Sequence, residues 1–311
     1  MSGFDEWPAL PYERWKDTYA TLHLWTQVVG KIKLALMPWT NHSWHTALYL
    51  TARGLTTGPL PYGARTLQID FDFSEHRLTI VTAEGALRAL PLEAQSVAGF
   101  YRKVMDTLDE LALPVSIHLM PNEIPDAIRC DQDELHCSYE AEAANRCWTA
   151  MLHAQRVLQR FRSGFIGKCS PVHFFWGSFD VAVTRFSGRH APPHPGGVPN
   201  LPDWVAREAY SHEVSSVGFW PGGPALPEPV FYSYAYPEPP GFSKVGVQPA
   251  AAFYHPTLRE FVLPYEAVRR AHSPDDELMA FCQSTYEAAA DLGNWDRAEL
   301  EYPRGALPGA A

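Results

Sequence analysis

Paired cysteines are the first feature that this chain lacks. Its five cysteines are odd in number and no two of them form a C-x-x-C motif: Cys130, Cys137, Cys147, Cys169 and Cys282. Small secreted domains rely on an even set of cysteines, and cysteine-based zinc sites usually show paired ones. The sequence therefore predicts reduced, mostly structural thiols, with neither a disulfide framework nor a zinc ribbon.

Positive charge is also scarce. Lys and Arg together number 25, against 35 Asp and Glu, which gives a formal net charge of −10. A protein that binds nucleic acid needs a basic field to contact the phosphates. We therefore expect no nucleic-acid partner, and a small-molecule ligand or substrate instead.

Long apolar runs are missing too. No stretch approaches the roughly 18 uninterrupted apolar residues of a membrane span. The opening residues, MSGFDEWPALPYERWKD, lack the basic segment, apolar run and small-residue cleavage site of a secretion signal. We expect no membrane partner and a cytoplasmic location.

What the chain does contain is a regular order of secondary-structure signals. Apolar side chains recur at helical spacing over residues 15–36 and again over 96–113. Between them, RTLQIDFDF at 65–73 alternates between apolar and polar side chains, and residues 77–83 form the returning strand. The first half is predicted to run helix, strand, hairpin, helix.

The second half repeats this order. A long helix is expected within residues 142–170, a strand-like stretch at 172–188, a hairpin at 250–265 and a closing helix at 275–293. This matched order predicts an α+β fold of two similar halves from an internal duplication, each an antiparallel β-sheet covered by amphipathic helices. Chance similarity of element order is the alternative.

The predicted boundaries follow from composition. The first α+β repeat is expected at residues 1–120, an acidic linker at 121–140 and the second repeat at 141–311. Of the 28 prolines, 14 lie between Pro192 and Pro256. Because proline interrupts helices and inner strands, we expect a loop insertion at 188–250 that is neither continuous helix nor central sheet. Its many aromatic residues argue against disorder.

Several long stretches of the chain resemble a known family. They include LPYERWKDTYATLHLWTQVVGKI, GKCSPVHFFWGSFDVAVTRFSGR and HPGGVPNLPDWVAREAYSHEVSSVGFWPGG. Together they resemble an uncharacterised bacterial family known only as a domain of unknown function, over nearly the whole chain. The resemblance implies membership in that family and a bacterial origin, and it implies no activity.

A set of histidines and carboxylates in the second half is the first candidate site. If the helix that begins near Asp203 continues to His212, then Glu208 and His212 are four residues apart and point the same way. The candidate metal ligands are His173, His194, His212 and His255, and the candidate catalytic carboxylates are Glu208 and Glu213. Such ligands suit a divalent transition metal, namely zinc, iron or manganese. No H-E-x-x-H signature is present, so a solvated surface pair of Glu and His is the alternative.

The stretch VHFFWGSFDVAVTRF is the second candidate site. Strict alternation along it places Trp176, Ser178 and Asp180 on one face, and His173, Phe175, Phe179 and Arg185 on the other. Asp180 lies between apolar residues, so burial of its face would raise its pKa or require a partner. We take Asp180 as a candidate catalytic group, and a structural Asp on a solvated sheet is the alternative.

These observations favour an enzyme that acts on a small molecule at the interface between the halves, where pockets commonly form. Substrate contacts are expected from Trp176, Arg185, Trp220 and Tyr234. If a metal is bound, its water would be the nucleophile in a hydrolytic or oxidative reaction. The alternative is a non-catalytic module that binds a ligand or a protein through the aromatic and proline-rich insertion. In the loop NHSWH we expect no site, unless the halves enclose a shared cleft.

Overall fold

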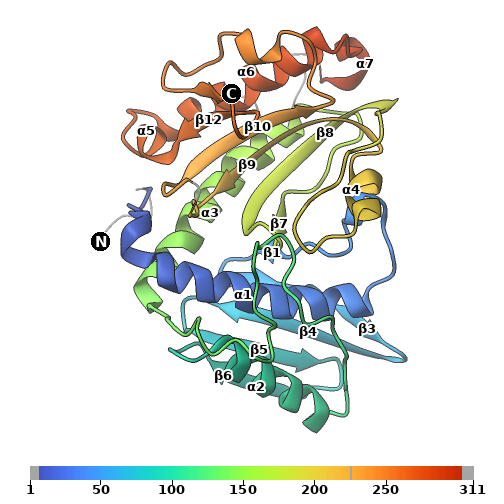
Figure 1. The fold of residues 1–311 in the computed structure, drawn as a ribbon, viewed down its shortest axis with the longest axis vertical. Helices are drawn as coiled ribbons and strands as arrows, with labels where there is room; N and C mark the ends of the chain where they lie inside the picture. Colours follow the sequence, from blue (N-terminus) through green and yellow to red (C-terminus); the bar gives the residue numbers. More distant parts are fainter. Residues whose placement is uncertain (1–6, 225, 303–311) are drawn as a thin grey trace.

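The computed structural model describes residues 7–224 and 226–302, which form a mixed α+β fold with two antiparallel sheets. One sheet lies in the lower half of Figure 1 and the other in the upper half. Helix α1 (Tyr12–Leu36) crosses the molecule between them, and most of its side chains are buried (Figure 1). The described residues include seven α-helices.

The first sheet has the strand order β1-β2-β4-β5-β6, with β3 paired to part of β4. Its strands are β1 (Tyr49–Leu50), β2 (Gly54–Thr56), β3 (Leu60–Tyr62), β4 (Arg65–Asp72), β5 (Arg77–Thr82) and β6 (Leu87–Pro91). Strands β4 and β5 confirm the predicted hairpin. Helix α2 (Val97–Glu110) packs beside α1, and Phe100 of α2 stacks on Trp25 of α1 with ring centroids 4.7 Å apart.

The second sheet has the strand order β11-β12-β10-β9-β8-β7. Its strands are β7 (His173–Phe175), β8 (Asp180–His190), β9 (His212–Trp220), β10 (Val230–Tyr236), β11 (Phe253–His255) and β12 (Glu260–Pro264). One face is covered by α3 (Ala141–Ser163) and α6 (Pro274–Leu292). In register on that face lie four buried side chains, Val181, Phe219, Phe231 and Leu263, which form the centre of the core.

The remaining short helices lie in connections between these elements. They are α4 (Asp203–Ala209), α5 (Tyr265–Arg269) and α7 (Arg297–Leu300), with the 3-10 turns η1 (Asn41–Ser43) and η2 (Phe242–Lys244). The two sheets touch where Leu48, just before β1, exchanges two backbone hydrogen bonds of 2.9 Å with Phe174 of β7. Residues 121–140, the predicted linker, contain no helix or strand.

The prediction that residues 188–250 lie outside the central sheet is wrong. Strands β9 and β10 come from this segment, and both are inner strands of the second sheet. The physical reason is where the prolines fall. Neither HEVSSVGFW nor VFYSYAY contains proline, so the prolines are confined to the connections and leave every ladder N–H of these strands free to pair.

The strict alternation expected along VHFFWGSFDVAVTRF is also wrong. The residues WGSF form a turn that joins β7 to β8, and the pairing register places Phe175 opposite Asp180. Residues opposite each other in an antiparallel pair share a face, so His173 and Phe175 lie on the same face as Asp180. A turn of four residues inside an apolar run hides this change from a pattern of period two.

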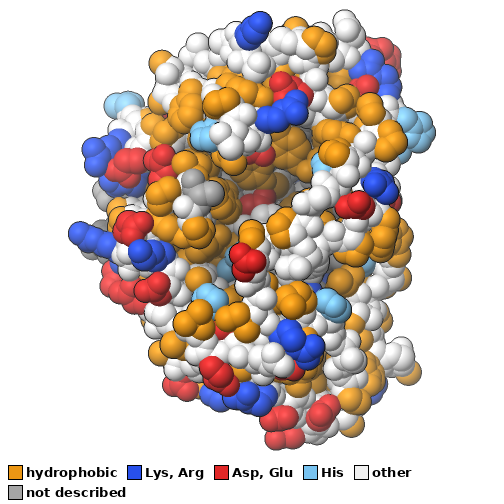
Figure 2. All heavy atoms as spheres, in the orientation of Figure 1, with side chains coloured by type: hydrophobic (Ala, Val, Ile, Leu, Met, Phe, Trp, Pro, Cys, Tyr) orange, Lys and Arg blue, Asp and Glu red, His pale blue; other side chains and the backbone are white. Residues whose placement is uncertain are grey.

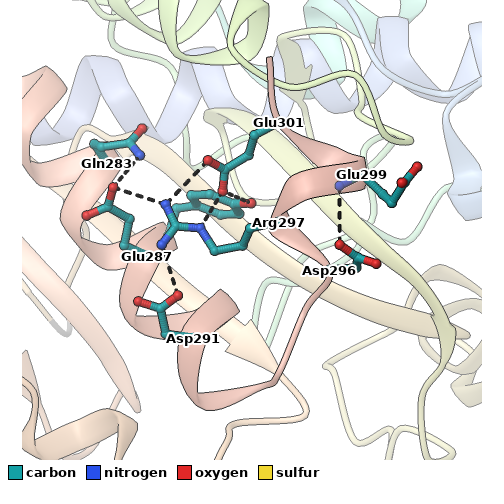
Figure 3. A network of polar contacts seen from close by, with 8 residues as sticks. Gln283, Glu287, Asp291, Asp296, Arg297, Glu299 and Glu301 are labelled. Carbon is teal, nitrogen blue, oxygen red and sulfur yellow. Dashed lines mark hydrogen bonds and ion pairs between the residues drawn. The ribbon is translucent and has the colours of Figure 1, made fainter. Parts of the chain in front are cut away.

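The C-terminal end of the described chain is fixed by Arg297 of α7 (Figure 3). Its guanidinium donates to Glu301 at 2.6 Å, to Asp291 at 2.9 Å and to Glu287 at 3.2 Å. Glu301 also accepts a hydrogen bond of 2.9 Å from the hydroxyl of Tyr286, a buried residue of α6. This network ties α7 to the last turns of α6.

All five cysteines are unpaired in the structure, and Cys130, Cys147 and Cys282 are buried. Across residues 7–224 and 226–302, no helix combines the length and the apolar character that crossing a bilayer demands.

Candidate functional site

A pocket of about 770 Å³ lies between the two halves. Its floor is the face of the second sheet that α3 and α6 leave uncovered, and its walls come from the end of α1 and from loops. The loop contributions come from residues 39–46, 118–123 and 198–210. Figure 2 shows a hollow near the middle of the molecular face that it draws. The hollow is surrounded mainly by hydrophobic side chains and has acidic side chains inside it.

The floor follows from strand alternation. Along each strand, every second side chain points to the helices, and the side chains between them point into the pocket. The pocket-facing set is Asp180, Ala182, Thr184 and Phe186 of β8, Val214, Ser216, Gly218 and Trp220 of β9, Val230, Tyr232 and Tyr234 of β10, and Glu260 and Val262 of β12. Polar residues on an open sheet face would normally meet water, but here the loops cover them.

Asp180 and Tyr232 form the central polar pair. The hydroxyl of Tyr232 donates a short hydrogen bond to the Asp180 carboxyl group, which is 6% exposed. Burial in the pocket, with a smaller contribution from the negative charge of Glu123, raises the pKa of Asp180 to about 7. Asp180 therefore exchanges a proton near neutral pH.

Gly218 makes room for this pair. A Cβ atom at Gly218 would lie 2.5 Å from the ring and hydroxyl of Tyr232. The missing side chain thus lets the Tyr232 ring lie directly over the backbone of β9, where its hydroxyl reaches Asp180.

Two further carboxyl groups line the pocket. Burial, and next the charge of Asp180, raises the pKa of Glu260 to about 7. Glu123 accepts a hydrogen bond of 2.7 Å from the hydroxyl of Ser178, and burial raises its pKa as well. Glu123 lies so close to the β7–β8 turn that a Cβ atom at Gly177 would be 1.9 Å from its carboxylate oxygen.

A tyrosine pair closes the same side of the pocket. The hydroxyl groups of Tyr210 and Tyr234 are 2.8 Å apart. Burial raises the pKa of Tyr210 to about 12 and raises that of Tyr234 as well, so both remain protonated at neutral pH. These hydroxyls can donate to a bound molecule or to each other.

Helix α1 supplies Lys31, which is the one lysine or arginine among the described residues that line the pocket. Its ammonium group donates to the side chain of Asn122, and burial lowers its pKa to about 8. The ammonium nitrogen lies 5.6 Å from the centre of the Trp176 ring. Gly30 lets the Trp176 ring lie close to α1, because a Cβ atom at Gly30 would lie 2.4 Å from that ring.

Helix α1 also holds the two loops that carry pocket residues. His23 donates to the carbonyl of Gly177 at 2.8 Å, and burial lowers its pKa to about 4, so its ring is neutral. Gln27 donates to the Asn122 carbonyl at 2.8 Å and accepts from the Asn122 N–H at 2.8 Å. These bonds fix the β7–β8 turn and the 118–123 loop against one rigid helix.

The pocket brings together four of the residues predicted from the sequence. They are Asp180, Trp176, Trp220 and Tyr234, and all of them line it. His42 of the NHSWH loop also lines it, in a pocket that both halves enclose.

The four predicted metal-ligating histidines are not among the described residues that line this pocket. His194 stacks on Tyr210 with ring centroids 4.7 Å apart, while His255 accepts a backbone hydrogen bond from Leu258 in the β11–β12 turn. His173 is 1% exposed among aromatic rings, and burial lowers its pKa to about 4. Within the described part of the chain, no three His, Cys, Asp or Glu side chains are placed to hold a metal ion.

The helix expected to carry both Glu208 and His212 ends at Ala209, and His212 begins β9. The four-residue spacing therefore does not place the two side chains on one helical face. Glu208 instead accepts hydrogen bonds of 2.8 and 2.9 Å from the backbone N–H of His42. His212 packs against His190, with ring centroids 4.4 Å apart.

Arg185 and Glu213 also lie outside the pocket. Arg185 is 2% exposed on the helix-covered face of the sheet, where its guanidinium lies 3.5 Å from the centre of the Phe161 ring. Glu213 forms an ion pair of 2.6 Å with Arg189 at the edge of the sheet. Both side chains have structural partners there.

The pocket contains functional groups that sequence reasoning missed, chiefly Lys31, Glu123, Tyr232 and Glu260. Glu123 lies in the predicted linker, and Lys31 lies in a helix whose sequence pattern is that of an amphipathic helix. A signal for Tyr232 was present, since the tyrosines of VFYSYAY alternate at period two.

The comparisons with known proteins agree with the resemblance seen in the sequence. The model described as "Family of unknown function (DUF5996)" matches residues 7–302, nearly the full chain. Searches among curated proteins and among solved structures gave no match.

Proposed function

Since the chain belongs to that family of unknown function, we propose its activity from the pocket alone. The proposal is an enzyme that binds a small organic molecule between the two sheets and transfers a proton to or from it through Asp180. The observation that carries it is a carboxyl group in an apolar pocket, held by Tyr232, with a pKa of about 7.

Proton transfer is most efficient when the pKa of the catalytic group lies near the working pH. An ordinary Asp is almost fully ionised at neutral pH, whereas Asp180 can serve there as acid or as base. The hydrogen bond from Tyr232 fixes the direction of the Asp180 carboxyl group, which lines the pocket. Glu260, with a pKa also near 7, supplies a second proton carrier.

The size and the walls of the pocket support a small organic ligand. Ligand pockets usually enclose about 300–1,000 Å³ and have apolar walls with a few polar groups, and this pocket, at about 770 Å³, has Trp176, Trp220 and Phe186 among its walls. The chemistry is assigned to the carboxyl groups because the candidate histidines are not gathered at this pocket.

We also propose that the two halves descend from one duplicated unit and that the pocket formed where the copies meet. The support is the order of elements, since α1, a first sheet and α2 are followed by α3, a second sheet and α6. In this proposal, residues 1–120 and 141–311 are the two copies.

The experiment that tests the function has two steps. The purified protein is incubated with a metabolite extract, and mass spectrometry records which compounds it retains and which it consumes. We expect consumption of a retained compound by the wild type, and a loss of at least about a hundredfold in rate for Asp180→Asn. Asp109→Asn, at an exposed position of α2, is the matched control.

Two outcomes would contradict the proposal in different ways. A compound that is retained equally by the wild type and Asp180→Asn, and consumed by neither, would favour the non-catalytic binding module. Consumption that is unaffected by Asp180→Asn would remove Asp180 from the mechanism.

A further inference from the structure

The charges inside the pocket are unbalanced. Among residues 7–224 and 226–302, its lining includes three carboxyl groups, from Glu123, Asp180 and Glu260, but one lysine and no arginine. Lys31 donates to the neutral side chain of Asn122. The pocket therefore has an excess of acidic groups without cationic partners of their own.

Two of these three carboxyl groups accept hydrogen bonds from hydroxyl groups. Asp180 accepts from Tyr232, and Glu123 accepts from Ser178 at 2.7 Å. The carboxyl group of Glu260 has no hydrogen-bond or ion-pair partner among the described residues. A carboxylate that is shielded from water and has no counter-charge is costly, so the surroundings of these groups favour their protonated forms.

Aromatic rings surround the same space. Trp176, Trp220, Tyr232 and Tyr234 line the pocket next to the carboxyl groups. The rings of Tyr232 and Tyr234 lie nearly parallel, with an interplanar angle of 13° and centroids 6.2 Å apart. Aromatic faces attract a positive charge, and a pocket that combines such faces with carboxylates is suited to an alkylammonium group.

We propose that the ligand of this pocket is an organic cation, in which an ammonium group is attached to an apolar body. This inference rests on the proposed function, because it names the class of molecule that the pocket binds. The ammonium group would lie between Asp180 and Glu260, and the apolar body would contact the tryptophan and phenylalanine walls.

Binding of a cation has a consequence for protons. A positive charge beside Asp180 and Glu260 would favour their ionised forms, so about one proton per ligand would leave the protein near neutral pH. The other titratable groups that line the pocket are Lys31, His42, His118 and Glu123, together with the tyrosines. Lys31 would oppose the effect only weakly, because burial lowers its pKa to about 8.

The test uses three probes with the same ring and nearly the same length, namely 2-phenylethylammonium, 2-phenylethanol and phenylacetate. Titration calorimetry at neutral pH measures the affinity of each, and repetition in buffers of different ionisation enthalpy counts the protons released. We expect the ammonium probe to bind about tenfold or more tightly than the alcohol, and phenylacetate to bind most weakly. Proton release is expected for the ammonium probe alone.

Variants locate the effect. Glu260→Gln and Asp180→Asn are each expected to bring the affinity for the ammonium probe down to that for the alcohol, with little change for the alcohol itself. Glu110→Gln, at an exposed position of α2, is the matched control and should bind all three probes as the wild type does. Circular dichroism confirms that each variant is folded, and either pocket variant alone suffices for the comparison.

The outcomes separate the two proposals. If the alcohol or phenylacetate binds as tightly as the ammonium probe, the cation inference is overturned while a small-molecule pocket stands. If none of the three binds at millimolar concentration, the cation inference is overturned, and the proposed function is overturned with it only if the protein also retains no compound from the metabolite extract.

Discussion

Replacement of Asp180 by Asn should change how the stability of this protein depends on pH. In the unfolded chain the carboxyl group titrates near its ordinary value of 3.8, whereas in the folded protein burial raises the pKa to about 7. A tenfold difference in proton affinity is worth about 1.4 kcal/mol, so this difference corresponds to about 4 kcal/mol.

The sign follows from which state holds the proton. The folded state binds the proton more tightly, so the stabilisation is complete below about pH 4 and is lost as pH rises through about 7. Asn cannot titrate, and its side-chain oxygen can still accept from Tyr232. We therefore expect equal stability of the two proteins at low pH and a more stable variant at alkaline pH.

Urea denaturation between about pH 4 and pH 9 measures this difference directly. The free energy of unfolding of the wild type should fall by up to about 4 kcal/mol more than that of Asp180→Asn over this range. The free energy of unfolding of Asp109→Asn, a variant at an exposed position, should change with pH in the same way as that of the wild type. Parallel curves for Asp180→Asn and the wild type would refute the reasoning, because they would mean that Asp180 is already ionised at low pH in the folded protein.

Two further variants test packing around the site and at the C-terminal end. Gly218→Ala would place a methyl group 2.5 Å from the Tyr232 ring and should cost roughly 1–3 kcal/mol in thermal or urea denaturation, whereas Gly246→Ala, with no atom within 4 Å, should be nearly neutral. Equal effects of the two would show that the Tyr232 ring is free to move. Arg297→Met removes the shared partner of Glu287, Asp291 and Glu301 and should destabilise the protein by roughly 1–2 kcal/mol, more at low salt. Arg270→Gln, at a side chain that is 73% exposed, should have little effect, and a loss as large as that of Arg297→Met would mean that the network at α7 adds no special stability.

Much of the fold could be predicted because its signals are local. The long helices α1, α2, α3 and α6 show apolar side chains at helical spacing, and the β4–β5 and β11–β12 hairpins show alternation around a turn. The proline density of the whole segment does not predict strands β9 and β10, because the prolines lie before, between and after these two strands and not inside them.

The site was predictable only in part, and the reason is distance along the chain. Asp180 is flanked by apolar residues, which marked it as a group with an altered pKa. Its neighbours Glu123 and Glu260 lie 57 residues before it and 80 residues after it, and nothing in the local pattern joins them. The candidate histidines show the opposite case. They come from one region of the sequence, but in the structure they lie on separate elements.

Because α1 belongs to the first half and contacts elements of the second half, the pocket limits how the chain can be divided, in evolution or by engineering. Lys31 and the anchors His23 and Gln27 belong to the first half, whereas the carboxyl groups Asp180 and Glu260 belong to the second. A gene fragment that encodes either half alone would encode half a pocket and no complete site. Under the proposed function, selection would act on both halves at once, and deletions, fusions or circular permutations should preserve ligand binding only where they keep α1 docked on the second sheet.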